Sequence, residues 1–227
     1  MRAEEELRSE SLLDAAQRVA GIQLRYARAG TSLARAAMAG ADALESLRHY
    51  PAGDVVDTAA GTRFYYHAHP SRRHPPDEHG HFHLFVYPGG SPSGPDFFHL
   101  AALSLDARGQ ALRWFTTNRW VTGERWREAP ALLEALARFE VRTRGRLAPV
   151  ADWLTAMVRL FEPQIAALVR RRDAVMARQF ARKGREGALE DRRLDVVSES
   201  GLSLPQRLHQ LSHPESDHPR FKPRRNP

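Results

Sequence analysis

Residues 63–69 read Arg-Phe-Tyr-Tyr-His-Ala-His, and residues 81–87 read His-Phe-His-Leu-Phe-Val-Tyr. In both stretches apolar and polar residues alternate. This pattern is typical of β-strands, because successive side chains point to opposite faces of a sheet. The proline-rich residues between them predict a loop. We therefore expect the two stretches to pair as an antiparallel hairpin.

The alternation suggests how this hairpin pairs. A register that places His69 opposite His81 also places His67 opposite His83, and it leaves the apolar side chains together on the other face. Opposed residues have Cβ atoms about 4.5–5.5 Å apart, so the imidazoles can converge on one ion. A shift of one residue would move the histidines to the opposite face. This register predicts a face with four histidines: His67, His69, His81 and His83.

Histidine is the commonest metal ligand in proteins, and the chain has no cysteine to compete with it. The four histidines are the predicted ligands of a divalent transition metal: zinc, iron, nickel, copper or manganese. His99, near the start of the next expected strand, is a further candidate ligand. Glu78 and His79 lie at the strand entrance and are candidates for orienting a ligand or acting as a catalytic base. Two alternatives remain open: metal-free catalytic histidines, and polar residues with only a structural role on a sheet face.

The rest of the chain predicts an α+β fold. Helical spacing of apolar residues appears in residues 3–48 and again in residues 130–183, where Pro163 interrupts it. Residues 63–117 predict a four-stranded, mostly antiparallel sheet packed against the N- and C-terminal helices, with a hairpin turn at Asp106-Ala-Arg-Gly. We expect residues 1–184 to form one domain and residues 185–227 to form a loosely ordered polar tail.

Composition narrows the class of protein. Of 227 residues, 42% are hydrophobic and 27% are charged, as in ordinary globular proteins. Because we find neither a membrane-length apolar run nor a signal peptide, we expect a cytoplasmic protein without a membrane partner. The sequence does not indicate an oligomeric state.

The net charge of +7 raises the question of nucleic-acid binding. Residues 138–183 alone carry a charge of that size, and the basic residues cluster toward the end of the last long helix. A helix C-terminus favours cations through its dipole, so we prefer this structural explanation to nucleic-acid contact. A non-catalytic binding module that uses this basic helix remains a third functional hypothesis.

A polar segment, Thr116-Thr-Asn-Arg-Trp-Val-Thr-Gly-Glu, follows the last expected strand. Arg119 is a candidate to grip a carboxylate or phosphate of a small-molecule substrate, with Asn118 orienting it. The competing interpretation is a turn that closes the sheet. Asp54 and Asp57 lie in a turn near residue 50 and favour a structural role over metal ligation.

One local resemblance involves His79-Gly-His-Phe-His-Leu-Phe. It is similar to the histidine-triad signature of nucleotide hydrolases and transferases, in which the middle histidine attacks phosphorus. The resemblance implies that His81 is a nucleophile in metal-free nucleotidyl or phosphoryl transfer. Gly80 departs from the family pattern, which usually has an apolar residue there.

A wider resemblance covers roughly residues 45–130. It rests on His49-Tyr-Pro-Ala-Gly-Asp, Tyr65-Tyr-His-Ala-His, Glu78-His-Gly-His-Phe-His and Thr117-Asn-Arg-Trp-Val-Thr-Gly-Glu. Together these blocks resemble an uncharacterised bacterial family of unknown function. The resemblance implies that the motifs belong to one module, and it implies no activity. The leading hypothesis is a metal-binding protein with a histidine-rich site on a hairpin, and a metal-dependent enzyme is one form of it.

Overall fold

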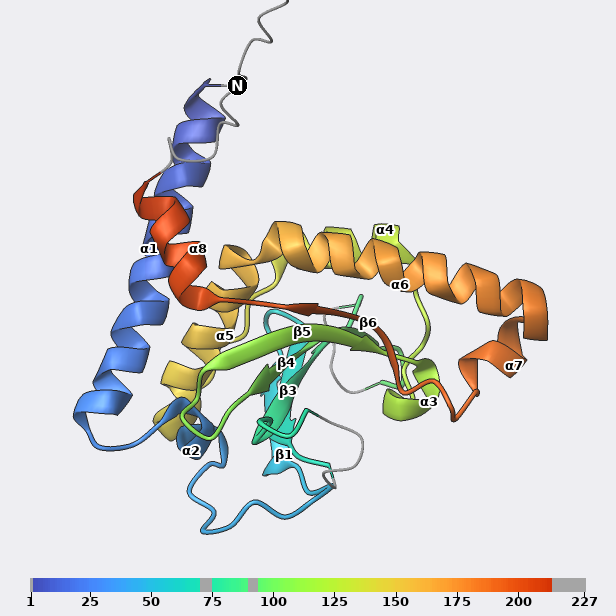
Figure 1. Ribbon diagram of the computed structural model, residues 1–227, viewed down its shortest axis with the longest axis horizontal. Coiled ribbons are helices and arrows are strands. Elements are labelled where there is room, and N and C mark those ends of the chain that lie inside the picture. Colours follow the sequence, from blue (N-terminus) through green and yellow to red (C-terminus); the bar gives the residue numbers. More distant parts are fainter. Residues whose placement is uncertain (1, 70–74, 90–93, 214–227) are drawn as a thin grey trace, which may run out of the picture.

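The computed structural model describes residues 2–69, 75–89 and 94–213, without the side chains of residues 2–10. In this part of the chain, an antiparallel sheet of six strands is joined by helices at both ends (Figure 1). The strands are β1 (Tyr50–Asp57), β2 (Thr62–His67), β3 (Gly80–Val86), β4 (Phe98–Leu105), β5 (Ala111–Thr117) and β6 (Val196–Gly201). The helices are α1 (Arg2–Arg28), α2 (Leu33–Ala37), α3 (Arg119–Thr122), α4 (Ala129–Arg138), η1 (Gly145–Leu147), α5 (Ala148–Leu160), α6 (Glu162–Lys183), α7 (Arg185–Leu189) and α8 (Leu204–Ser212).

The α+β class and the antiparallel sheet are confirmed, but the prediction of four strands is wrong. The spatial order follows the chain from β1 to β6, so the two additional strands lie at the edges of the sheet. Edge strands tolerate proline, glycine and polar residues, because half of their backbone groups need no partner strand. Both β1, with Pro51 and Gly53, and β6, with Ser198, Glu199 and Ser200, have this composition.

The segment expected to be a loose tail is structured over much of its length. Strand β6 pairs with β5 along its whole length, and Leu204 at the start of α8 is buried in the main core. Backbone pairing holds β6 in place, and its side chains show no apolar period from which a strand could be predicted. Residues 214–227, the end of the predicted tail, lie outside the described residues.

The helical region predicted over residues 3–48 ends earlier than expected. Helix α2 ends at Ala37, and the backbone then turns through Ala39 and Gly40, both with positive φ values. The predicted interruption near Pro163 is confirmed, because α5 ends at Leu160 and α6 begins at Glu162 with the proline in its first turn.

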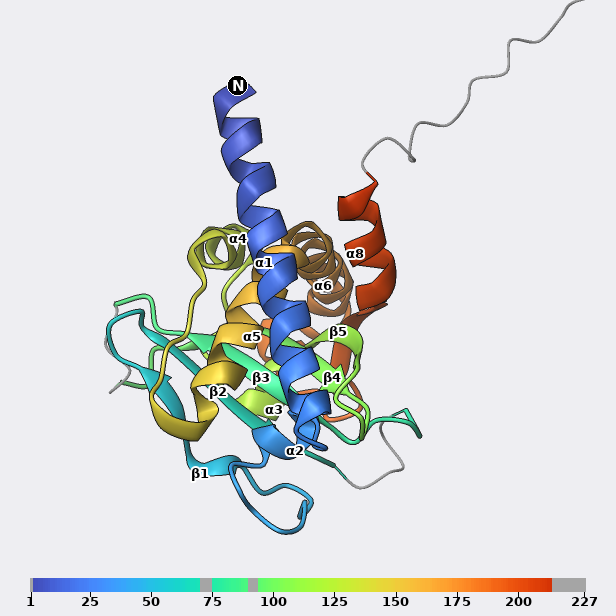
Figure 2. The same ribbon diagram turned by 90° about the vertical axis from the view of Figure 1, so that its left-hand side faces the viewer.

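The helices form a layer over one face of the sheet. Figures 1 and 2 show α4, α5 and α6 on this side, while α1 runs along α5. The side chains of Phe64, Tyr66, Phe82 and Leu84 from β2 and β3 enter the main core, where Phe82 meets Trp153 of α5. In Figure 1, α3 and the segment between α2 and β1 lie on the other side of the sheet.

The hairpin of β2 and β3 forms as predicted, but its register differs by two residues. His67 lies opposite His81, and Tyr65 lies opposite His83. An even shift keeps every side chain on its expected face, so the apolar pattern cannot distinguish the two registers. As a result His69 falls beyond the end of β2 instead of pairing with His81.

None of the helices in the described ranges combines the length and the apolar character needed to cross a membrane.

Candidate metal centre

Three buried histidines converge on the face of the sheet opposite the main core. His67 comes from β2, and His81 and His83 come from β3. One ring nitrogen of each lies within 4.8 Å of the others, and the ring centroids are 4.5–5.0 Å apart. Their exposed fractions are 6%, 0% and 1%. Three imidazoles gathered in this way could hold a metal ion.

A carboxylate orients the central histidine. Nδ1 of His81 lies 2.6 Å from Oε1 of Glu78, while the Ser104 hydroxyl donates to Oε2 of Glu78 at 2.7 Å. Arg113 approaches Oε2 of the same carboxylate at 3.4 Å. Because a carboxylate accepts, Nδ1 of His81 carries the proton, which leaves Nε2 as the ligand nitrogen of this tautomer. Metal-binding histidines commonly have this carboxylate partner.

Three residues that contact Glu78 belong to one row of side chains that crosses four strands. His67 lies opposite His81, His81 opposite Ser104, and Ser104 opposite Arg113. Ser104 and Arg113 were not predicted as site residues. Their positions on the histidine face follow from the two-residue period of β4 and β5, which was the available signal.

His99 and Thr117 orient His83. Nδ1 of His83 lies 2.9 Å from Nε2 of His99, and Nδ1 of His99 lies 3.2 Å from the Thr117 hydroxyl. If His83 donates to His99 and His99 donates to Thr117, then Nε2 of His83 presents its lone pair. His99 therefore touches a member of the cluster and lies outside the three converging nitrogens.

Burial favours the neutral forms of His83, His99 and Glu124. Desolvation lowers the pKa of His83 well below its usual value, and neighbouring histidines lower it further. Desolvation, with a contribution from Arg172, lowers the pKa of His99 to about 3. Burial also raises the pKa of Glu124, which accepts from the His99 backbone amide at 2.6 Å, to about 7. Neutral imidazoles are the form that binds metal.

His69, the fourth predicted ligand, lies beside the cluster. Its ring is stacked on His81 with centroids 5.3 Å apart and meets the edge of His67 at 4.6 Å. Because it follows the end of β2, it is less buried than the three strand histidines. It lines the cavity next to them.

The other predicted catalytic residues lie elsewhere. Nδ1 of His79 is 2.8 Å from the hydroxyl of Tyr66, whose ring belongs to the main core, so the three histidines of the local histidine-triad resemblance are not brought together. Arg119 forms ion pairs with Glu186 at 2.6 Å and Glu190 at 2.9 Å.

The other polar residues considered from the sequence also have structural contacts. Asn118 caps α3 and donates to the carbonyl of Ala188. Asp57 accepts from the amides of Ala59 and Ala60, while Asp54 pairs with His49 and Arg63.

Gly80 separates His79 from His81 and has almost no room around it. A Cβ atom there would lie 2.7 Å from the carbonyl oxygen of His67 and 2.7 Å from the hydroxyl of Tyr66. Real Cβ atoms do not approach other atoms so closely. The departure from the histidine-triad signature at this position therefore has a steric cause.

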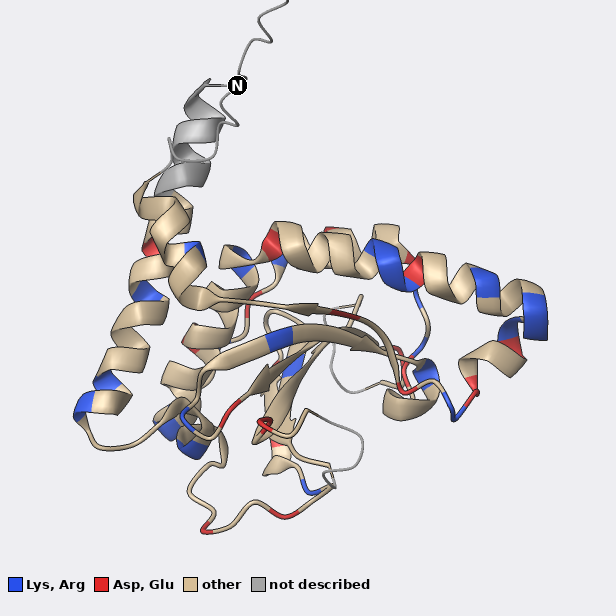
Figure 3. Ribbon diagram, in the orientation of Figure 1, with Lys and Arg blue, Asp and Glu red and all other residues tan. Residues whose placement is uncertain are grey.

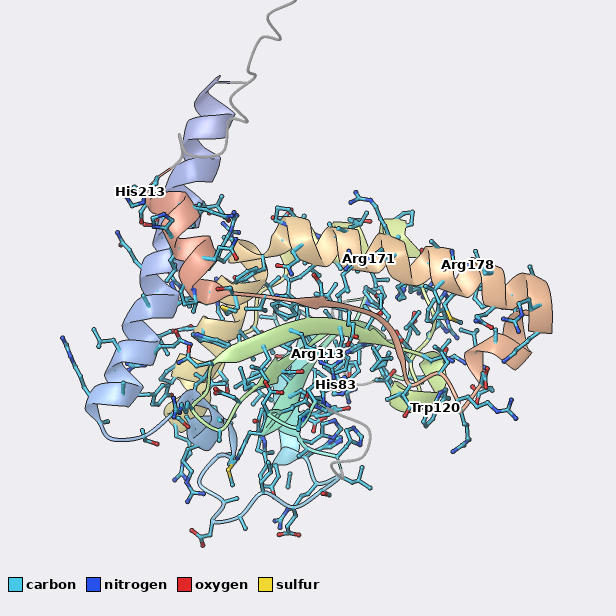
Figure 4. All side chains as sticks on the ribbon, viewed as in Figure 1. His83, Arg113, Trp120, Arg171, Arg178 and His213 are labelled. Atoms are coloured by element: carbon cyan, nitrogen blue, oxygen red, sulfur yellow. The ribbon has the colours of Figure 1, made fainter. Side chains whose placement is uncertain are left out.

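A cavity of about 290 Å³ adjoins the histidines. Figure 4 shows His83 near the middle of the sheet and Trp120 on α3 beside it. Five of the ten lining residues are apolar. The lining residues are Leu47, His69, His81, His83, Phe115, Thr117, Trp120, Val121, Asp195 and Val196.

The basic residues of α6 lie away from the histidines. Figure 3 shows where Lys and Arg residues lie along this helix and at its C-terminal end. Arg170, Arg178 and Arg182 are exposed, whereas Arg172 is buried over the Trp126 ring and pairs with Asp173. Of these arginines, Arg182 lies in the last turn of α6, where the helix dipole favours a cation.

Comparison with known proteins places the chain in a family. The model of a domain of unknown function (DUF6969) matches residues 13–202, and the chain belongs to this family. The matched range contains all six strands and the histidine cluster. The expectation of an uncharacterised family is thus confirmed. No curated protein and no solved structure matches the chain significantly.

Proposed function

We propose that the protein binds one divalent transition metal ion through His67, His81 and His83, and that the ion serves a metal-dependent reaction in the adjoining cavity. The contact that best supports this proposal is the one between Glu78 and His81. It holds a fully buried imidazole in the tautomer in which Nε2 is the ligand nitrogen.

The donor set indicates the kind of ion. Three imidazoles suit zinc, iron, nickel and copper, and fit magnesium or calcium poorly because these prefer oxygen ligands. Catalytic zinc sites typically use about three protein ligands and keep a position open for water or substrate. An ion in such a site supplies Lewis acidity.

The surrounding residues have distinct roles in this proposal. Glu78 orients His81, while His99 and Thr117 orient His83. His69 is close enough to the cavity to contact a substrate. We assign His79 and Arg119 structural roles, because Tyr66 and two glutamates respectively already bind them.

The test is elemental analysis of protein purified without an affinity tag. We expect about one transition metal ion per chain in the parent. Replacement of any one of the three histidines by glutamine should abolish it. The matched control is His79→Gln, a histidine of the same hairpin outside the cluster, which should keep its metal. Circular dichroism must show that each variant is folded. A folded parent that takes up none of zinc, iron, nickel, copper or manganese would refute the proposal.

A further inference from the structure

We propose that the cavity beside the histidines binds a small, uncharged ring compound that carries one metal-binding oxygen group. The part of this inference that concerns the oxygen group rests on the proposed metal site. The part that concerns the ring rests on the size and lining of the cavity.

The size of the cavity limits its ligand. At about 290 Å³ it lies at the lower end of the usual range for ligand pockets, roughly 300–1,000 Å³. It therefore suits a single ring with a short substituent, and it is too small for a dinucleotide or an extended peptide.

The lining of the cavity combines two kinds of surface. His81 and His83 belong to the proposed metal site. Leu47, Trp120 and Val121 supply apolar surface, and so does Phe115, whose ring centroid is 5.2 Å from that of His81. The Trp120 indole donates to the carbonyl of Leu194, which fixes the position of its ring. Flat aromatic walls favour a flat apolar ligand through stacking and edge contacts.

The charge of the lining excludes several ligand classes. Among the described lining residues there is no lysine or arginine, and the acidic residue is Asp195. A phosphate ester would meet no cation except the metal ion, and it would lie near a carboxylate. The Thr117 hydroxyl contacts His99, as described above. The lining therefore favours an uncharged ring over nucleotides and sugar phosphates.

The first experiment uses two probes with the same metal-binding group. Acetohydroxamate and benzohydroxamate are titrated into cobalt-loaded protein, and binding is followed by the visible absorption of cobalt. Benzohydroxamate should bind at least about 10-fold more tightly, because burial of its ring adds apolar contact. Leu47→Trp, at an exposed cavity edge, and Val121→Trp should remove this preference while cobalt binding stays unchanged. The matched control is Val56→Trp on the edge strand β1, which should keep the preference.

The second experiment separates the inference from the proposed function. Toluene binding to metal-free protein is measured by saturation-transfer NMR, and it should be weakened by Leu47→Trp and not by Val56→Trp. If cobalt binds but both hydroxamates bind equally, or the ring preference survives both cavity variants, the inference is overturned and the metal site stands. If cobalt does not bind, the proposed function fails. The toluene result then decides whether the cavity accepts an apolar ring.

Discussion

The two faces of the β2–β3 hairpin are equally buried and chemically opposite. On one face Phe64, Tyr66 and Phe82 pack into the main core, and on the other His67, His81 and His83 surround a small volume. Burial of the apolar rings stabilises the fold, whereas burial of imidazoles costs free energy unless their polar atoms are bonded. The first face thus explains why the hairpin folds. The second uses part of that stability to keep three imidazoles buried side by side. The predictions below test this division, from the largest expected effect to the smallest.

Removal of a core ring should have the largest effect. Phe82→Ala deletes a fully buried side chain that contacts Phe64, Tyr66 and Trp153. We expect the free energy of unfolding, measured by urea titration, to fall by about 3–5 kcal/mol. The exposed Val56→Ala should change it by less than about 0.5 kcal/mol. A folded Phe82→Ala that still binds metal would support the division of roles, and a small loss of stability would contradict it.

Metal should stabilise the protein through the histidine face alone. With free metal at about 100 times its dissociation constant, the free energy of unfolding of the parent should rise by about 2.7 kcal/mol. His83→Gln should show no such gain, because one of the three ligands is missing. Thermal denaturation with and without zinc measures both values. Equal stabilisation of parent and variant would place the bound ion somewhere else.

Loss of the orienting carboxylate should weaken the metal site without removing it. Glu78→Gln deprives His81 Nδ1 of its charged acceptor, and we expect the metal affinity to fall about 10- to 100-fold. Competition with a chelator measures this change. Glu199→Gln is the matched control, because Glu199 is the exposed second carboxylate partner of Arg113. An unchanged metal affinity in Glu78→Gln would contradict the proposal that this carboxylate orients His81 for metal binding.

Removal of the Thr117 hydroxyl, the last group in the row of hydrogen bonds from His83 through His99, should have the smallest effect on metal affinity. Thr117→Val removes the hydroxyl that contacts His99, and we expect metal affinity to fall by less than about tenfold. The neighbouring Thr116→Val is the control. Its hydroxyl contacts Ser198 and does not belong to this chain of contacts. If both variants lower affinity equally, the effect comes from the strand as a whole.

The central strands and the histidine face could be predicted because they repeat with a period of two residues. In β2 and β3 the alternation predicted which side chains lie in the core and which gather on the other face. Edge strands β1 and β6 lack that period, and their pairing depends on backbone groups that every residue has. A local sequence pattern therefore could not reveal them.

The candidate site could be predicted in kind but not in detail. The histidine types and Glu78 were evident from the sequence. The two-residue difference in register, which leaves His69 beyond the strand, leaves the apolar pattern intact and was not predictable from it. The assignment of Arg119 to substrate binding overlooked Glu186 and Glu190, which are far from it in sequence and adjacent in the fold.

Gly80 has a consequence for how this family can evolve. Any larger residue there would push against the main-chain carbonyl of His67 and against the hydroxyl of Tyr66, whose ring lies in the main core. A single mutation would therefore disturb core packing and the backbone beside the histidine cluster together. Lineages that keep the histidine cluster should retain glycine at this position even after most of the surrounding sequence has diverged.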